Sequence, residues 1–408
     1  MRAFLVLPCV RRRSTVGFLR YLASTSKATS PPPSALRDAE KHWLLKKPKG
    51  KMTIAKQMKI YSQLSKARLS ALVVMTTSAG FFMAGAPIGW GTLAATCVGT
   101  TLAACSANTF NQLHEVKTDA LMNRTRGRPL PMGKISRMHA AGWGLGTGVA
   151  SAGLLAIGAG PLVAGLGVFN IGLYAGIYTP MKLKSEWNTW IGAIVGAIPP
   201  VMGYAAVTGT VATPEAALLS STLFLWQFPH FFSLAWIYKA DYAKGGYKMV
   251  PVADPTGART AQLVERYAAY MVPLPLAACA MDVTSYMFAV ESIFINGYAY
   301  MLARNFANDP NKESARKVFK ASLWYLPVML TLMVYHSRSW EQKKGDGLAI
   351  VDAKNVLKEA CPHEVMFSND VESNTNITAD NKKSMCPIPE KLNFKKTNED
   401  DSTRRNNA

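Results

Sequence analysis

Apolar residues gather into five long segments that carry almost no charge, and short basic segments separate them. Four of the apolar segments are long enough for two membrane-spanning helices each, because one span needs about 20 residues. The fifth is long enough for one span. Gly, Pro or a charged residue marks the middle of each longer segment, where the chain can turn. The segments are residues 69–114, 139–181, 187–238, 267–302 and 321–337. The pattern predicts an all-α, polytopic membrane bundle of about nine transmembrane helices.

The two ends of the chain differ from this bundle. Residues 1–33 carry five arginines before the first acidic residue, Asp38, which is typical of a mitochondrial transit peptide. A secretory signal is the alternative, because residues 3–10 are apolar, but that run is short and three arginines follow it. Residues 34–68 form a basic segment, with an amphipathic stretch near residues 52–64 that suits a membrane surface. Residues 338–408 are polar and without periodicity, so we expect a disordered tail.

Composition and charge agree with a membrane protein, since 49% of the residues are hydrophobic and only 17% are charged. The net charge of +21 comes from short segments beside apolar runs, so nucleic acid is not an expected partner. Basic residues occupy the N-terminal segment and every second loop. By the positive-inside rule these loops face one compartment, which is the mitochondrial matrix if residues 1–33 are a transit peptide. The spacing of the six cysteines suggests neither a disulfide framework nor a metal cluster.

The most informative polar residues lie at the end of the second predicted span. Asn111, Glu115 and Asp119 are spaced four apart, so their side chains are expected on one face of a helix. Oxygen ligands in this arrangement suit Mg²⁺, which binds one or two carboxylates together with substrate phosphates. The three residues, called the oxygen trio below, are therefore candidate metal ligands.

Two arginines and two prolines follow the oxygen trio. Arg124 and Arg128 are close enough in sequence to reach it, and Pro129 and Pro131 are expected to stop the helix. Carboxylates beside arginines suit a diphosphate that a metal bridges on one side and guanidinium groups bind on the other. An allylic diphosphate leaves as its charge is neutralised, and the resulting carbocation is captured by an electron-rich acceptor. Ordinary ion pairs at a solvated helix end are the alternative, but carboxylates at the mouth of an uncharged bundle are costly unless used.

Residues 108–133 resemble the first Asp-rich motif of the UbiA-type intramembrane prenyltransferases, in which an Asn and two acids are spaced four apart. In detail they are similar to the protohaem IX farnesyltransferase branch, which makes haem O for cytochrome oxidase assembly. The middle acid, Glu115, is Asp in other branches. Further matches lie in residues 64–74, 178–182, 188–190, 196–203, 226–231 and 241–247.

The resemblance implies that residues 69–337 form a prenyltransferase domain in the mitochondrial inner membrane. It implies that the oxygen trio holds Mg²⁺ and the head of farnesyl diphosphate, and that the farnesyl group passes to a vinyl group of protohaem IX, giving haem O for haem A synthesis. The other partners expected are the lipid bilayer and, as candidates, downstream haem A synthesis proteins and a second copy of the chain. The candidate diphosphate-binding cations are Arg124, Arg128, Lys182, Lys244 and Lys248.

The second signature of the wider family is incomplete in this chain. Quinone-type members carry a second pair of acids here, whereas Asp241 stands among lysines without an acidic partner. The haem branch shares this lack, and the number of metal ions stays open. Lys244 or Lys248 is a candidate for the charge that a second metal would otherwise provide, and the alternative is that these lysines only mark the positive-inside face.

Polar residues within the predicted spans have two interpretations each. His230 is either a core residue bonded to the carbonyl that Pro229 frees, or, as the resemblance implies, a haem contact. Asn111 and Asn188 would also suit hydrogen bonds between helices.

Glu291, within the eighth span, has no counterpart in the family and is left unassigned, with a hydrogen bond to Asn296 as one explanation. Small residues in the third and fourth spans predict close approach between helices. They are Gly142, Gly144, Gly146, Gly148, Gly165, Gly172 and Gly176.

Two other functions are compatible with parts of the pattern. A quinone-ring prenyltransferase would share the oxygen trio, but the missing acid pair and the segment around His230 argue against it. An ion-coupled transporter could use the trio as an ion site. Such sites usually lie near the membrane midplane in broken helices, whereas this trio lies at one end of a span.

Overall fold

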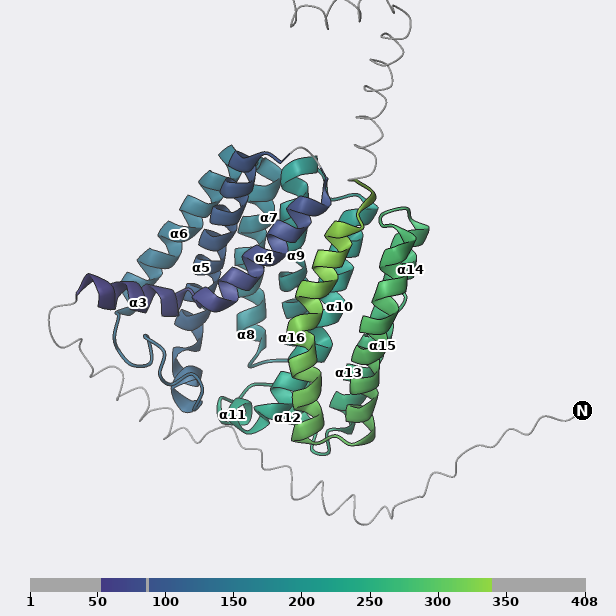
Figure 1. The fold of residues 1–408 in the computed structure, drawn as a ribbon. Coiled ribbons are helices and arrows are strands. Elements are labelled where there is room, and N and C mark those ends of the chain that lie inside the picture. The colour runs from purple at the N-terminus through teal and green to yellow at the C-terminus, as the bar shows by residue number, and fades with distance from the viewer. Residues whose placement is uncertain (1–52, 86–87, 340–408) are drawn as a thin grey trace, which may run out of the picture. The chain divides into compact units, whose positions relative to one another are not determined.

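The computed structural model describes residues 53–85 and 88–339. The expected transit peptide, most of the basic N-terminal segment and the expected tail lie outside the described residues. Within the described ranges the regular structure is entirely helical, apart from one isolated bridge between Thr284 and Ser337 (Figure 1). The elements are α3 (Ile54–Leu64), α4 (Ala67–Met83), α5 (Trp90–Leu121), α6 (Arg137–Gly158), α7 (Pro161–Gly172), the π-helix η1 (Leu173–Tyr178), α8 (Thr179–Met181), α9 (Asn188–Thr208), α10 (Pro214–Ile237), α11 (Lys239–Lys244), α12 (Val250–Ala253), α13 (Ala258–Met271), α14 (Leu274–Ala280), α15 (Tyr286–Asn308) and α16 (Lys312–Tyr335).

In the described residues the helices form nine columns that correspond to the nine expected spans, which confirms the all-α bundle. The fourth column is built from α7, η1 and α8, and the seventh from α13 and α14 with a break before Leu274. Four columns are long and apolar enough to cross a membrane by length and composition alone: α6, α7 to α8, α9 and α16. Polar residues such as Glu115 in α5 lower the hydropathy of other columns.

The expectation that Pro129 and Pro131 stop the helix of the second span is wrong. α5 ends at Leu121, well before the two prolines, and Met122 turns to an extended conformation. The hydroxyl of Thr125 donates to the carbonyl of Asp119, and the carboxylate of Asp241 accepts from two backbone N–H groups beyond the helix end. Hydrogen bonds from distant residues, rather than proline, therefore hold the chain after the helix.

Two other boundaries also differ from the expectation. The seventh column begins at Ala258 and the ninth at Lys312, nine residues earlier in each case than the apolar segments begin. Both helices begin with a turn that contains charged residues. A pattern of apolar positions does not detect such a turn. The division near Asp282 is confirmed, because this residue adopts a left-handed backbone conformation (φ +55°) between α14 and α15.

Most of the glycines that were expected at close helix contacts do not make them, and other glycines do. A Cβ atom at Gly80 would lie 1.9 Å from the carbonyl oxygen of Pro200, and one at Gly203 would lie 1.8 Å from that of Thr77. These glycines therefore allow α4 and α9 to touch backbone to backbone. Gly144 and Gly148 also face neighbouring side chains, but the expectation is wrong for the others, which face open space: Gly142, Gly146, Gly165, Gly172 and Gly176.

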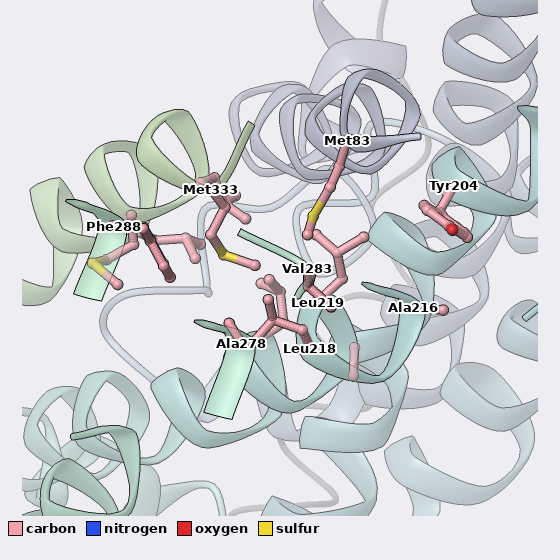
Figure 2. Close-up of a cluster of buried hydrophobic side chains, with 14 of the residues drawn as sticks. Met83, Tyr204, Ala216, Leu218, Leu219, Ala278, Val283, Phe288 and Met333 are labelled. Atoms are coloured by element: carbon pink, nitrogen blue, oxygen red, sulfur yellow. The ribbon is translucent and has the colours of Figure 1, made fainter. Parts of the chain in front are cut away.

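One end of the bundle is closed by an apolar cluster. Figure 2 shows Met83, Leu219, Val283 and Met333 together in this cluster. It lies at the end that contains α14, whereas α11 and α12 lie at the other end (Figure 1).

The carboxylate of Glu291 contacts Nε2 of His336 at 3.2 Å, and the other ring nitrogen of His336 contacts the hydroxyl of Ser285. The suggested bond to Asn296 is wrong, because Asn296 instead accepts from Tyr325 (2.6 Å). Glu291 thus joins the start of α15 to the end of α16.

The amphipathic stretch before the first span forms α3, as expected. Tyr61 stacks on Trp143 with ring centroids 4.4 Å apart and bonds to His139, while Ile54 and Met58 are exposed. Between α3 and α4 the chain turns at Lys66, whose φ of +47° is unusual for a residue with a side chain. This turn directs Lys66 toward α5.

Candidate active site

The oxygen trio lies on one face of the last three turns of α5. Asn111 and Asp119 are fully buried, and Glu115 is 6% exposed. The spacing of four therefore places the three side chains together as expected, and the neighbouring columns enclose them.

Three cations surround the oxygen trio. Lys182, which follows α8, contacts Glu115 at 2.8 Å, and Arg128 contacts Asp119 at 2.6 Å and Glu115 at 3.7 Å. The ammonium of Lys66 donates to the side-chain oxygen of Asn111 at 2.7 Å. Three separate segments of the chain thus bring positive charge to one helix end.

Burial and these contacts shift the pKa values of the three cations. Burial is the largest single effect on Lys182 and lowers its pKa, but Glu115 and the nearby tyrosines together raise that pKa well above its usual value. Burial likewise opposes the charge of Arg128, and Asp119 outweighs it and raises the pKa of the arginine. For Lys66, burial and the nearby Arg128 dominate, and its pKa falls to about 7. Lys66 is therefore the cation that would gain most from a bound anion.

The oxygen trio fits one Mg²⁺ ion. The Oδ1 atom of Asp119 is buried and has no hydrogen-bond partner among the described residues, and carboxylate and amide oxygens are suitable ligands. No group of three His, Cys, Asp or Glu side chains with metal-binding geometry occurs in the part of the chain that the structure describes. Two carboxylates and one amide are thus the donors that the oxygen trio offers.

Three tyrosines and a threonine contact the oxygen trio, its cations or the adjoining part of α5, and the sequence analysis assigned none of them a role. Thr179 accepts from the amide of Asn111 (3.0 Å), and Tyr174 accepts weakly from Lys66 (3.4 Å). Tyr178 lies under the ammonium of Lys182, 4.4 Å from the ring centroid. Tyr247 contacts Thr118 on α5. The π-helix η1 places two of these tyrosines, and such helical bulges often occur at functional sites.

Lys66 was also missed as a site residue. It was counted among the basic residues before the first span and within the matching segment 64–74, but no role was predicted for it. Its position could have indicated a role, because only one other charged residue lies between it and the first apolar segment.

An apolar cavity of about 470 Å³ adjoins the oxygen trio and its cations. Tyr174 and Tyr178 belong both to its wall and to the surroundings of the cations. Side chains of α4, α5, α7, α9, α10 and α16 complete the wall, mostly Leu, Val, Ala, Pro and aromatic residues. The cavity can hold an extended apolar group whose charged end lies at the oxygen trio.

His230 lies in the wall of this cavity. Its ring stacks on Trp226 at 4.8 Å between centroids and lies 5.0 Å from Phe319. Its Nδ1 atom contacts the hydroxyl of Ser322 on α16 at 2.8 Å, so the carbonyl that Pro229 frees is not its partner. The structure thus places an imidazole beside the apolar space.

The remaining candidate cations do not touch the oxygen trio. Arg124 donates to the hydroxyl of Tyr242 at 2.9 Å and lies over the rings of Tyr238 and Tyr242. Lys244 and Lys248 are exposed, and the N–H of Lys248 donates to the backbone carbonyl of Lys182. Asn188 also holds this loop, since its amide donates to the carbonyl of Lys248 at 2.7 Å.

A helical bundle with buried carboxylates and cations at the mouth of an apolar cavity suits lipid-like substrates with an anionic head. The model of the UbiA prenyltransferase family matches residues 73–325, and the chain belongs to this family. This confirms the resemblance noted from residues 108–133.

Named relatives are also similar to the chain. The human protein protoheme IX farnesyltransferase, mitochondrial, is 44% identical over 275 residues, which are 67% of this chain and 61% of that protein. The chain thus aligns with less than two thirds of the human relative. Protoheme IX farnesyltransferase of Solibacter usitatus is 36% identical over 288 residues, which are 68% of this chain and 98% of that protein.

The fold is similar to solved structures. A structure from a study of digeranylgeranylglyceryl phosphate synthase superposes with a TM-score of 0.59 at 14% identity, and covers 70% of this chain and 99% of that one. At this identity the likeness concerns the fold alone.

Proposed function

We propose that this protein transfers the farnesyl group of farnesyl diphosphate to a vinyl group of protohaem IX and so makes haem O. The observation that carries the proposal is the buried oxygen trio with three cations at the mouth of an apolar cavity that also contains His230. The names of the similar human and bacterial proteins support the choice of acceptor.

The charge of the cluster suits a diphosphate bound with a metal ion. With Lys66 protonated, Lys66, Arg128 and Lys182 against Glu115 and Asp119 leave one positive charge. A prenyl diphosphate has about three negative charges near neutral pH, so one such group with one Mg²⁺ would bring the site to neutrality. We propose that the oxygen trio holds that Mg²⁺, which would neutralise charge on the leaving diphosphate.

The protein's own residues position the substrate and protect the reaction. Lys66, Lys182 and Arg128 hold the diphosphate by charge-assisted hydrogen bonds as the bond between C1 and oxygen breaks. The apolar wall keeps water from the allylic cation until the terminal carbon of a vinyl group bonds to C1. Water then adds to the inner vinyl carbon and loses a proton, which leaves a hydroxyethylfarnesyl group.

The acceptor is proposed to lie in the cavity with its iron near His230. Lys244 and Lys248 are exposed at the same end of the bundle. Three roles are open to them: they pair with the haem propionates, they bind the diphosphate, or they only mark the basic face of the membrane. Arg124 would need to leave its two tyrosines to reach a bound diphosphate.

The same proposal includes the location. Nine membrane crossings would place the oxygen trio on the matrix side of the mitochondrial inner membrane, with residues 1–33 as a transit peptide, α3 on the membrane surface and residues 338–408 as a tail on the opposite face. Proteolysis of intact and opened mitochondria, followed by mapping of the fragments, tests this orientation.

The direct test is a Mg²⁺-dependent assay of the purified protein with farnesyl diphosphate and protohaem, read as haem O formation. Asp119→Asn should remove nearly all turnover while the bundle stays folded. Prenylation of a benzoate in place of haem would show a quinone-ring prenyltransferase instead. Solute flux in vesicles that Asp119→Asn abolishes, with no prenyl transfer by the unaltered protein, would show a transporter.

A further inference from the structure

The hydrogen bonds of Ser322 determine which nitrogen of His230 carries the proton. The Ser322 hydroxyl lies 2.7 Å from the backbone carbonyl of Phe319 and 2.8 Å from Nδ1 of His230. A hydroxyl has one proton to donate, and a carbonyl can only accept. If the proton pointed to Nδ1, two oxygens would face each other at 2.7 Å with no hydrogen between them. The arrangement is favourable only if Ser322 donates to the carbonyl and accepts from an Nδ1–H group.

This assignment leaves the other nitrogen of His230 with a free lone pair. In a neutral imidazole only one nitrogen carries a proton, so Nε2 is then an acceptor and a metal ligand. Nε2 has no hydrogen-bond partner among the described residues, and His230 forms part of the cavity wall. Trp226 stacks on the His230 ring, and Phe319 packs against it in a tilted arrangement.

We propose that Ser322 is a positioning residue that fixes the tautomer of His230, so that Nε2 presents its lone pair to the iron of the porphyrin acceptor. The inference rests on the proposed function, because it takes protohaem as the occupant of the cavity. Histidines that bind metals generally donate their second ring N–H to a fixed acceptor, and Ser322 supplies that acceptor here. The iron–imidazole bond would hold the porphyrin ring in one position while a vinyl group receives the farnesyl chain.

Removal of the hydroxyl should leave the helices in place. The backbone carbonyl of Ser322 separately accepts from the indole N–H of Trp226 at 2.9 Å, and this bond between α10 and α16 does not need the serine side chain. Ser322→Ala therefore tests the tautomer, and Ser322→Thr keeps a hydroxyl at the same place. Ser220→Ala is a matched control on α10, because the Ser220 hydroxyl also bonds to a carbonyl three residues earlier but touches no histidine.

The experiment titrates two porphyrins into the purified full-length protein and its variants. Ferric protohaem is followed by its Soret band, whose position reports whether an imidazole binds the iron, and metal-free protoporphyrin IX is followed by fluorescence. In Ser322→Ala the affinity for ferric protohaem should fall about 10-fold or more, with loss of the Soret signature of imidazole-bound iron. His230→Ala should lose that signature completely. Affinity for metal-free protoporphyrin IX should be unchanged in both, and Ser322→Thr and Ser220→Ala should match the unaltered protein.

Two results would overturn the inference. Equal weakening of both porphyrins in Ser322→Ala would show that the hydroxyl only shapes the cavity. An unchanged ferric spectrum in Ser322→Ala or in His230→Ala, in a protein that forms haem O normally, would overturn this inference alone. Failure of the unaltered protein to form haem O would overturn the proposed function and this inference together.

Discussion

The buried ion pair between Lys182 and Glu115 allows the catalytic and structural contributions of one contact to be separated. At 2.8 Å and an effective dielectric constant of about 20, two unit charges attract by about 6 kcal/mol. Arg128, 3.7 Å from the other carboxylate oxygen, attracts Glu115 by about 4 kcal/mol on the same scale. Lys182→Met would thus leave Glu115 buried but partly compensated.

Removal of one partner of a buried pair typically costs about 3–5 kcal/mol, and the remaining Arg128 contact places this case near 3 kcal/mol. For a domain of this size that corresponds to a fall of roughly 6–12 °C in the unfolding midpoint. Adding Glu115→Gln should restore most of the midpoint, because neither charge is then left without its partner. Haem O formation should fall about 100-fold or more in either single variant and stay low in the double variant.

The assays are thermal unfolding in detergent and haem O formation on the same preparations. Lys317→Met is the matched control, because Lys317 pairs with Glu313 on an exposed helix face and its loss should leave both measurements unchanged. If the double variant recovered activity together with stability, the pair would be only structural, and the assignment of Lys182 to the diphosphate would be wrong.

Three further predictions concern other parts of the molecule. Lys66→Met should lower kcat/KM for farnesyl diphosphate about 100-fold, measured in the haem O assay, because a buried cation beside the diphosphate is lost, and Lys66→Arg should recover part of it. Gly203→Ala should destabilise the bundle by about 1–3 kcal/mol in thermal unfolding, since its Cβ would lie 1.8 Å from the oxygen of Thr77, whereas Gly142→Ala, with open space, should not. EDTA should reduce haem O formation to background, and added Mg²⁺ should restore it without a change in the unfolding midpoint.

The helices and the oxygen trio could be predicted from the sequence because both depend on local spacing. The length of an apolar segment determines whether a helix can cross a bilayer, and a repeat of four places side chains on one face of a helix. Asn111, Glu115 and Asp119 therefore lie together in the structure as their spacing indicated. Boundaries were less certain, since the charged first turn of α16 belongs to the helix but not to its apolar segment.

The tertiary structure alone decided which side chains meet the oxygen trio and the histidine. Lys66 and Asn111 are 45 positions apart, and His230 and Ser322 are 92 apart, so no periodicity within one helix connects them. Arg124 is near the trio in sequence but contacts two later tyrosines instead, one at the end of α10 and one in α11. Such contacts depend on the direction in which each helix presents its face to its neighbours, and that direction is set by packing across the whole bundle.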